Sequence, residues 1–365
     1  MQTKSGLRPR HAGWYAGALL LVLALLGLVL YGTGVIGSGG DDDSVDRACD
    51  GSLAQGGLSA ALHSSRLSAE DLDDGDYLAS CRVRTEASGA ERGALEVKLR
   101  WSTSKAPAST LVWYNANYNG VRDRAAPLGH GWPGVLRHES GTYQVMVALD
   151  CVNQRNKALV AYGDLLGAAN STTLTGLGQV TTETAREAAE KHGCQVEAGQ
   201  RITGLSPGLL GRSGAAEPLL RQADGSCAAL RDTEAARNGT PDVLEYPADP
   251  DTPQVNCYLV TKAGKPGYGL YAYYGASAKD FLASEEAALK AATGPYGEHD
   301  YTWATSTCRS AQPAVFALYR LYDEDTGGYP VPHYSDSFAR SALTAFAAHE
   351  AKQRGCGSVR TAAQP

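Results

Sequence analysis

The residues with the clearest potential for acyl-transfer chemistry are Ser102 and Lys105, which are spaced as in an SxxK motif. On a helix this spacing places the lysine one turn from a serine nucleophile, whose proton it accepts. Here the pair follows a strand-like segment in a polar, proline-containing stretch, and the SDN and KTG motifs are absent from the sequence. We therefore interpret the pair as part of a loop. The sequence also lacks GxSxG, HExxH, Walker A and a GxGxxG motif before a helix.

Metal-binding chemistry is not favoured by the spacing of histidines and acidic residues. The histidines after residue 36 are scattered, with none at metal-ligand spacing from another: His63, His130, His138, His192, His299, His333 and His349. The acidic segments 70–76 and 323–325 offer oxygen ligands suited to calcium, but the first lacks EF-hand spacing and the second is typical of a hairpin turn. We predict solvated turns at both. Adjacent His349 and Glu350 point apart on a helix, which favours surface positions, and we expect no metal ion or cofactor.

A tyrosine-rich segment, YGLYAYYG, is the candidate binding surface in this sequence. In a strand, Tyr268 and Tyr274 face one side while Tyr271 and Tyr273 face the other. We then expect at least one pair to be partly exposed, and exposed tyrosines suit contacts with a protein or a glycan. The alternative is that these tyrosines pack beneath a helix.

Eight cysteines follow the apolar N-terminal segment: Cys49, Cys81, Cys151, Cys194, Cys227, Cys257, Cys308 and Cys356. An even number of cysteines outside the membrane is typical of disulfides formed in an oxidising compartment. We therefore expect four disulfides and no free thiol.

The spacing of these cysteines indicates an internal repeat. Successive separations are 32, 70 and 43 residues among the first four cysteines, and 30, 51 and 48 among the last four. Each set also ends in a helix-like segment closed by Gly-Cys, at Gly193 and Gly355, where glycine suits a helix C-terminus. Tyr162 and Tyr319 each lie eleven residues after the third cysteine of their set, in strand-like segments.

The repeat limits the possible pairing of the cysteines. If bridges stay within a repeat and both repeats use one scheme, three pairings remain. The first and third separations nearly match between the repeats, whereas the second differs by 19 residues, as if an insertion lies there. The matching separations favour Cys49 with Cys81, Cys151 with Cys194, Cys227 with Cys257, and Cys308 with Cys356.

Residues 14–36, WYAGALLLVLALLGLVLYGTGVI, contain no charged side chain and are long enough to cross a bilayer. Three basic residues precede this segment and three aspartates follow it, so the positive-inside rule places the N-terminus in the cytoplasm. We predict a cytoplasmic N-terminus over 1–13, a transmembrane helix over 14–36 and a flexible spacer over 37–46. The alternative is a signal peptide, cleaved at a small-residue site near Val35 and Gly37.

The hydrophobic patterns in the rest of the chain predict an α+β fold after the N-terminal transmembrane helix. In segment 94–101, leucine and valine alternate with Glu96, Lys98 and Arg100, which indicates a sheet with one solvated face. Similar patterns predict strands near 77–84, 110–115, 143–149, 158–162, 255–260, 268–274, 301–305 and 315–322. Helical patterns cover 57–65, 182–192, 228–237, 279–292 and 337–354. The last helix carries Phe338, Ala342, Phe346 and Ala347 along one stripe.

We therefore predict two tandem repeats, each an antiparallel sheet with helices packed on one face. The first extracytoplasmic domain covers 47–198 and the second 223–358. A linker without clear periodicity covers 199–222, and a C-terminal tail covers 359–365.

The overall layout resembles a group of membrane-anchored or secreted actinobacterial proteins with no assigned activity. The shared features are a single N-terminal span, a short acidic spacer and tandem four-cysteine repeats that end in helix, Gly, Cys. The resemblance covers nearly the whole chain, rests on layout and implies no catalytic residue.

These observations favour a single-pass, membrane-anchored extracytoplasmic binding or scaffold protein without catalytic activity. Its expected partners are the membrane, through the N-terminal helix, and an extracellular protein or glycan. Nucleic acid is excluded because the net charge of -6 provides no basic footprint. The alternative is a cell-envelope hydrolase or transferase whose site is assembled from residues distant in sequence.

Overall fold

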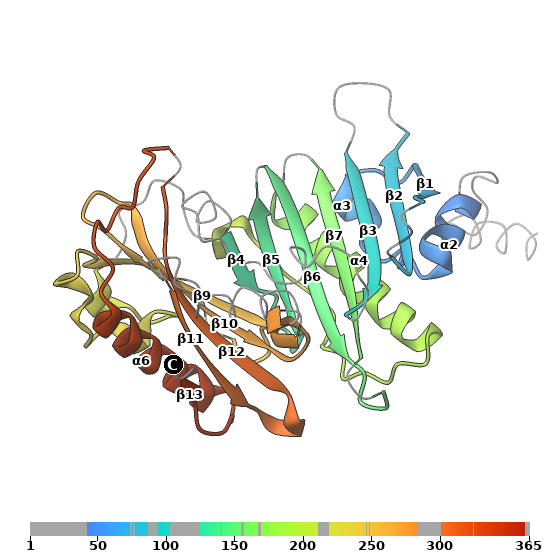
Figure 1. The fold of residues 1–365 in the computed structure, drawn as a ribbon. Coiled ribbons are helices and arrows are strands. Elements are labelled where there is room, and N and C mark those ends of the chain that lie inside the picture. Colours follow the sequence, from blue (N-terminus) through green and yellow to red (C-terminus); the bar gives the residue numbers. More distant parts are fainter. Residues whose placement is uncertain are drawn as a thin grey trace, which may run out of the picture. The chain divides into compact units, whose positions relative to one another are not determined.

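The computed structural model describes residues 42–361, apart from residues 74, 76, 140, 246, 248, 280 and 324 and segments 87–92, 103–123, 155–156, 167–168, 211–218 and 283–300. In this range the chain forms two antiparallel sheets and few helices (Figure 1), which confirms the α+β class. The membrane helix expected over 14–36 and the strand expected near 110–115 lie outside the described residues. So does most of the helix expected over 279–292. No helix among the described residues is both long and apolar enough to cross a bilayer.

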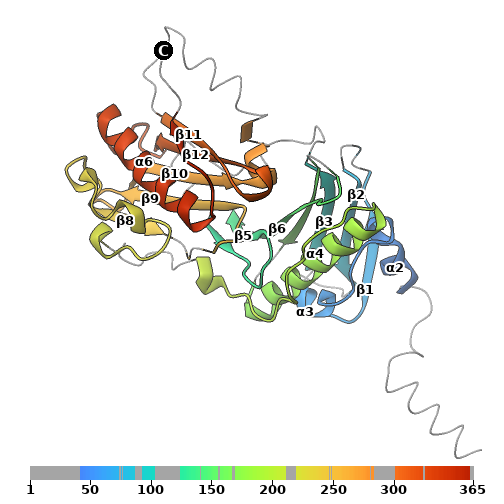
Figure 2. The ribbon, with the colours of Figure 1, turned by 90° about the horizontal axis from the view of Figure 1, so that it is seen from below.

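The first sheet has seven strands in the order β1-β2-β3-β7-β6-β5-β4. Their bounds are β1 Leu67–Asp71, β2 Ala79–Thr85, β3 Ala94–Trp101, β4 Arg124–Pro127, β5 Gly134–Glu139, β6 Thr142–Asp150 and β7 Ala158–Leu166. Helix α4 (Ser171–Lys191) crosses one face of this sheet, next to the short α3 (Leu58–Leu62), as Figure 2 shows. Helix α2 (Asp42–Gly51) begins inside the segment expected to be a flexible spacer.

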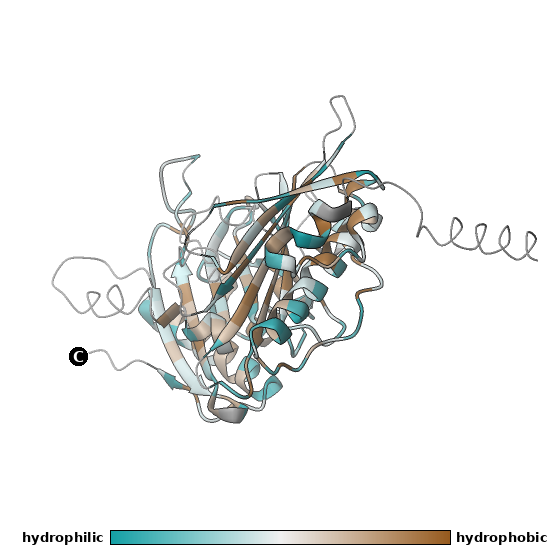
Figure 3. Cartoon of the chain, turned by 90° about the vertical axis from the view of Figure 1, so that its right-hand side faces the viewer, coloured by the Kyte–Doolittle hydropathy of each residue, from teal (hydrophilic) through white to brown (hydrophobic). Residues whose placement is uncertain are grey.

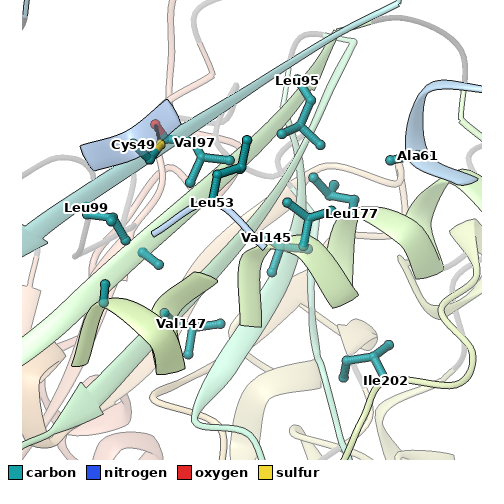
Figure 4. Close-up of a cluster of buried hydrophobic side chains, with 14 of the residues drawn as sticks. Cys49, Leu53, Ala61, Leu95, Val97, Leu99, Val145, Val147, Leu177 and Ile202 are labelled. Atoms are coloured by element: carbon teal, nitrogen blue, oxygen red, sulfur yellow. Dashed lines mark hydrogen bonds between the residues drawn. The ribbon is translucent and has the colours of Figure 1, made fainter. Parts of the chain in front are cut away.

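The first core lies between this sheet and α4. Alternate residues of β3, namely Leu95, Val97 and Leu99, are at most 1% exposed and point toward the helix side, where Leu177 of α4 also lies (Figure 4). Each fully buried side chain of this kind contributes roughly 1.5–3 kcal/mol relative to an exposed one. Figure 3 shows the same pattern as hydrophobic segments along the strands and hydrophilic patches on the helices.

The opposite face of the first sheet is not uniformly solvated as the alternation in β3 suggested, since it carries polar side chains on β3 and a buried apolar cluster that includes Val135, Met146 and Val160. Arg100 is completely buried, and its Nε donates a hydrogen bond of 3.1 Å to the hydroxyl of Tyr162 on β7. Glu96 is only partly exposed and pairs with Arg82 of β2. A guanidinium can be buried in this way because a hydroxyl acceptor compensates part of its lost hydration.

Helix α4 begins eleven residues before the predicted start at 182. The extra turns, STTLTGLGQVT, are rich in threonine and glycine, which are poor helix formers. Asn170 caps the helix, because its side chain accepts hydrogen bonds from the backbone N–H groups of Thr172 and Thr173. Tertiary packing explains the rest, since Gly176 lets α4 approach the backbone of α3.

Replacing Gly176 by alanine should destabilise the protein by about 1–3 kcal/mol, although alanine is the better helix former by about 1 kcal/mol. The added Cβ would lie 2.5 Å from the backbone nitrogen of Ala61 and 2.6 Å from the carbonyl oxygen of Gly57, and neither can move cheaply. Urea unfolding measures this loss. Gly178→Ala in the same helix is the matched control and should cost less, because its Cβ would first meet the mobile Cδ1 of Leu205. Equal losses for the two variants would contradict this account.

The second sheet has six strands in the order β13-β11-β12-β10-β9-β8. Their bounds are β8 Asp242–Glu245, β9 Gln254–Val260, β10 Pro266–Tyr274, β11 Tyr301–Thr307, β12 Pro313–Arg320 and β13 Arg360–Thr361. Helix α6 (Asp336–Gln353) packs on this sheet through the predicted stripe of Phe338, Ala342, Phe346 and Ala347, all of which are buried. The helix expected over 228–237 is instead two 3-10 turns, Ala228–Leu230 and Glu234–Ala236.

All four predicted disulfides are present: Cys49–Cys81, Cys151–Cys194, Cys227–Cys257 and Cys308–Cys356. Cys81 and Cys257 lie on β2 and β9, while Cys151 and Cys308 directly follow β6 and β11. No cysteine is free. Each bridge therefore stays within one of the two sheets and the segments that pack on it.

The two sheets share one strand order over five strands. The series β1-β2-β3-β7-β6 has the same chain connections as β8-β9-β10-β12-β11. The first sheet adds β4 and β5 between the second and third cysteines, which is where the spacing indicated an insertion. Tyr162 and Tyr319 do lie on corresponding strands, but two register positions apart. The corresponding positions are Gly163, which lies opposite Val97, and Leu318, which lies opposite Leu270. Tyr162 lies one residue before its reference position, whereas Tyr319 lies one residue after its own.

The segment expected as a linker over 199–222 is partly built into the two cores. Ile202, Leu205 and Leu210 are at most 3% exposed and belong to the first core, whereas Leu220 belongs to the second. The first hydrophobic core therefore extends past residue 198.

Candidate functional site

The tyrosines expected to form a binding surface are buried. Tyr268, Tyr271 and Tyr273 are at most 1% exposed, and Tyr274 is 7% exposed. On one face of β10 the Tyr268 ring lies 5.3 Å from that of Phe338 on α6, and on the other the Tyr273 ring lies 4.9 Å from that of Phe281. The expectation of an exposed pair is corrected, because both faces of β10 are covered by packed aromatic side chains.

Ser102 has a structural hydrogen-bonding role. Its backbone N–H donates to the carbonyl oxygen of Ala158 at 2.9 Å, and its Oγ accepts from the N–H of Ala158 at 3.1 Å. The serine thus extends the pairing of β3 with β7 by one residue. Lys105 lies outside the described residues.

The two acidic segments do not converge on a metal site, and neither is simply a solvated turn. Glu70 belongs to β1 and pairs with Arg84 at 3.1 Å, while the Asp71 carboxylate accepts the N–H of Cys49 at 2.8 Å. Asp323 lies at a turn, as expected, but its side chain is 1% exposed and pairs with Lys265 at 3.1 Å. Across residues 42–361, leaving out the gaps, no group of three histidines, cysteines or acids is placed to hold a metal ion.

A pocket of about 360 Å³ is the strongest candidate site. Its lining comes from the loop before β5, the end of β6, the segment after α4, the loop before β9, the end of β10, the turn after β11 and the C-terminal end of α6. The polar residues in this lining are Asp150, Glu197, Asp251, Tyr274, Arg309, Gln312 and Arg354. The volume lies within the range typical of small-ligand pockets.

One wall of the pocket is a network built on the last turn of α6. Glu350 and Arg354 are one helical turn apart, and Glu350 is 3% exposed. The hydroxyl of Tyr274 donates a 2.9 Å hydrogen bond to Oε2 of Glu350. The guanidinium of Arg354 lies 3.9 Å over the Tyr274 ring and donates to the carbonyl oxygens of Thr252 and Asp249. The network therefore fastens α6 to β10 and to the loop before β9.

Burial dominates the electrostatics of this region. It raises the pKa of the Glu350 carboxyl, and the hydrogen bond from Tyr274 and the positive charge of Arg354 oppose this shift only in part. It also raises the pKa of Tyr274 well above the ordinary value, and the nearby Glu350 carboxylate adds to the shift. Burial raises the pKa of Asp150 as well, although Nζ of Lys279 lies 3.5 Å from its Oδ1 and opposes the shift.

The raised pKa of Glu350 predicts a specific pH dependence of stability. Between the unfolded value near 4.5 and the raised folded value, the folded chain holds more protons than the unfolded chain, so stability falls as the pH rises through that window. Glu350→Gln stays neutral at every pH, so its stability should fall less steeply. Urea unfolding at a series of pH values tests this.

Glu234→Gln is the control for this pH series, because the Glu234 side chain is 67% exposed. It should follow the unmodified protein. Parallel pH profiles for Glu350→Gln and the unmodified protein would show that the buried carboxyl is not the cause.

Sequence reasoning missed Glu350, Arg354 and the pocket, although one signal was available. Glu350 lies four residues after Phe346, on the apolar stripe of the closing helix, so it should have been expected in the core and not at the surface. A carboxylate on such a stripe requires a buried partner. Its partner, Tyr274, comes from a distant strand, which the sequence alone does not indicate.

Comparisons with known proteins give no family for this chain. No family model matches it, and no curated protein matches it. Among solved structures, one match is the di-domain ARO/CYC StfQ from the steffimycin biosynthetic pathway, at 9% identity, covering 83% of this chain and 91% of that chain. The TM-score is 0.15, which carries no argument about fold or function. The layout resemblance to actinobacterial proteins stays a prediction.

Proposed function

We propose that this chain is a single-pass, membrane-anchored extracytoplasmic binding or scaffold protein without catalytic activity. The observation that carries the proposal is the set of four disulfides, which leaves no free cysteine. Disulfides persist in oxidising compartments and are rare in the cytosol. In this proposal residues 14–36 are the anchor, and the two sheets lie outside the cell.

The proposal includes an internal duplication, in which 47–198 and 223–358 are two copies of one fold. The common five-strand order and the corresponding positions of the bridged cysteines support it. Each copy is large enough to have its own hydrophobic core. Two similar modules on one anchor suit a protein that presents binding surfaces.

Two polar groups of the pocket, Tyr274 and Arg354, are held in structural contacts and are not free for catalysis. The Tyr274 hydroxyl donates to Glu350, and the Arg354 guanidinium donates to two backbone carbonyls. Both groups are therefore engaged in structural hydrogen bonds. A hydrolase or transferase, the alternative, requires a nucleophile or general base that is free to reach its substrate, a role that would fall to Glu197 or Asp251 of the lining and not to Tyr274 or Arg354.

Protease added to intact cells tests the proposed topology. The expected result is removal of a fragment close to the full extracytoplasmic region, while a cytoplasmic marker protein stays intact. Protection of the chain would overturn the proposal. Release of the chain into the medium with a new N-terminus near Ser38 would replace the anchor by a cleaved signal peptide.

Cross-linking on intact cells tests the binding or scaffold role. The expected result is a discrete adduct of the full chain with one extracellular protein or glycan, absent when the chain is deleted. Recovery of only uncross-linked chain, under conditions that cross-link a known envelope complex, would contradict this role.

A further inference from the structure

The pocket contains polar groups that the fold does not use. Within the described part of the chain, the side chains of Glu197, Asp251 and Arg309 make no hydrogen bond or ion pair, and Oε1 of Gln312 is a buried acceptor without a partner. The other charged residues of the lining are engaged, since Asp150 faces Lys279 and Arg354 binds carbonyls, with the Asp251 carboxylate close enough to act on its charge. The pocket therefore offers two carboxylates and one guanidinium.

These groups differ in charge, which restricts the ligand. A simple anion would be repelled by Glu197 and Asp251, and a simple cation would be repelled by Arg309. A molecule with both charges satisfies all three. An ammonium donates to the carboxylates, whereas a carboxylate accepts from the guanidinium in a planar, two-point arrangement.

We propose that the pocket binds a small zwitterion that carries an ammonium and a carboxylate, of the size of an amino acid or a dipeptide. The volume of about 360 Å³ admits a molecule of this size and not a folded partner. Arg309 binds the carboxylate, and Asp251 with Glu197 binds the ammonium. This inference rests on the proposed binding function and names a ligand class for it.

Equilibrium binding to the full chain in detergent tests the proposal with four probes: alanine, Ala-Ala, N-acetyl-Ala-Ala and Ala-Ala amide. Saturable binding is expected for alanine or Ala-Ala. Whichever of the two binds tells a free amino acid from a peptide. Capping either end of the dipeptide should weaken binding about 10- to 100-fold, because each cap removes a charge-assisted contact.

Variants assign the two charges separately. Arg309→Gln should weaken binding of the zwitterion about 10- to 100-fold and leave binding of Ala-Ala amide unchanged. Asp251→Asn should also weaken binding of the zwitterion, but it should leave binding of N-acetyl-Ala-Ala unchanged. Arg237→Gln, whose side chain is 82% exposed and remote in sequence from the pocket lining, is the control and should bind normally. Unfolding in urea checks that each variant is folded.

Two results would overturn the inference: no saturable binding of either uncapped probe up to about 10 mM, or equal binding of capped and uncapped probes. Either result leaves the proposed function standing if intact-cell proteolysis and cross-linking succeed. Failure of those cell experiments, with zwitterion binding intact, would instead refute the extracytoplasmic role and retain the ligand class.

Discussion

Replacing Cys151 and Cys194 together by alanine should lower the free energy of unfolding by about 4 kcal/mol. This bridge closes a loop of 43 residues that contains β7 and helix α4. In the chain-entropy model, opening a loop of this length restores about that much conformational freedom to the unfolded chain. Both cysteines are also at most 7% exposed, so the alanines remove some packing.

Urea unfolding of the oxidised full chain is the measurement for this variant. Val152→Ser is the matched control, because Val152 follows Cys151 directly and is 67% exposed. It should change stability by less than about 0.5 kcal/mol. A loss below about 1 kcal/mol in the double alanine variant would show that the bridge adds little constraint beyond that of the folded sheet.

Arg354→Met should cost about 3 kcal/mol, because it leaves two carbonyl oxygens of a partly buried site without their charged donor. Methionine retains the packing on the Tyr274 ring but removes the donor to the carbonyl oxygens of Thr252 and Asp249. It also leaves the Glu350 carboxyl without its compensating positive charge. Arg354→Lys should recover little, because an ammonium does not reproduce the planar fork of guanidinium donors.

A double-mutant cycle with Glu350→Gln isolates the charge interaction. Once Glu350 is neutral, the further cost of Arg354→Met should be smaller, because only the hydrogen bonds to the carbonyls are lost. Arg309→Gln is the control, since this exposed arginine shares the pocket but makes no ion pair among the described residues. Additive costs for Arg354→Met and Glu350→Gln would show that the two charges do not interact.

The sequence predicts those parts of the fold in which one face of an element is apolar throughout. Strand β3 and helix α6 were expected within a few residues, because their buried positions recur with a single period. Strands β6, β9 and β10 were also expected within a few residues, although β9 and β10 are buried at every position. The disulfide pairing was also predicted, because the first and third cysteine separations nearly match between the two halves of the chain.

Other parts depend on distant partners and were therefore not predictable. The first half of α4 has poor local helix propensity and forms because Gly176 packs against α3. The alternation in β3 predicts a solvated Arg100, because the sequence does not show that strand pairing places Tyr162 next to it. Likewise, the pocket combines β6, β10 and the end of α6, which no local pattern connects.

The placement of the four disulfides has a consequence for mechanical load. A protein held at one end by a membrane and at the other by a partner is pulled along its chain, and force passes through a bridge without extending the segment that the bridge encloses. The enclosed segments here, with cysteine separations of 32, 43, 30 and 48 residues, contain both long helices α4 and α6. Under tension, these helices add no length even after the sheets rupture. Between Cys49 and Cys356, only the 70- and 51-residue stretches between bridges and the connection between the sheets can be extended, at up to about 3.6 Å per residue.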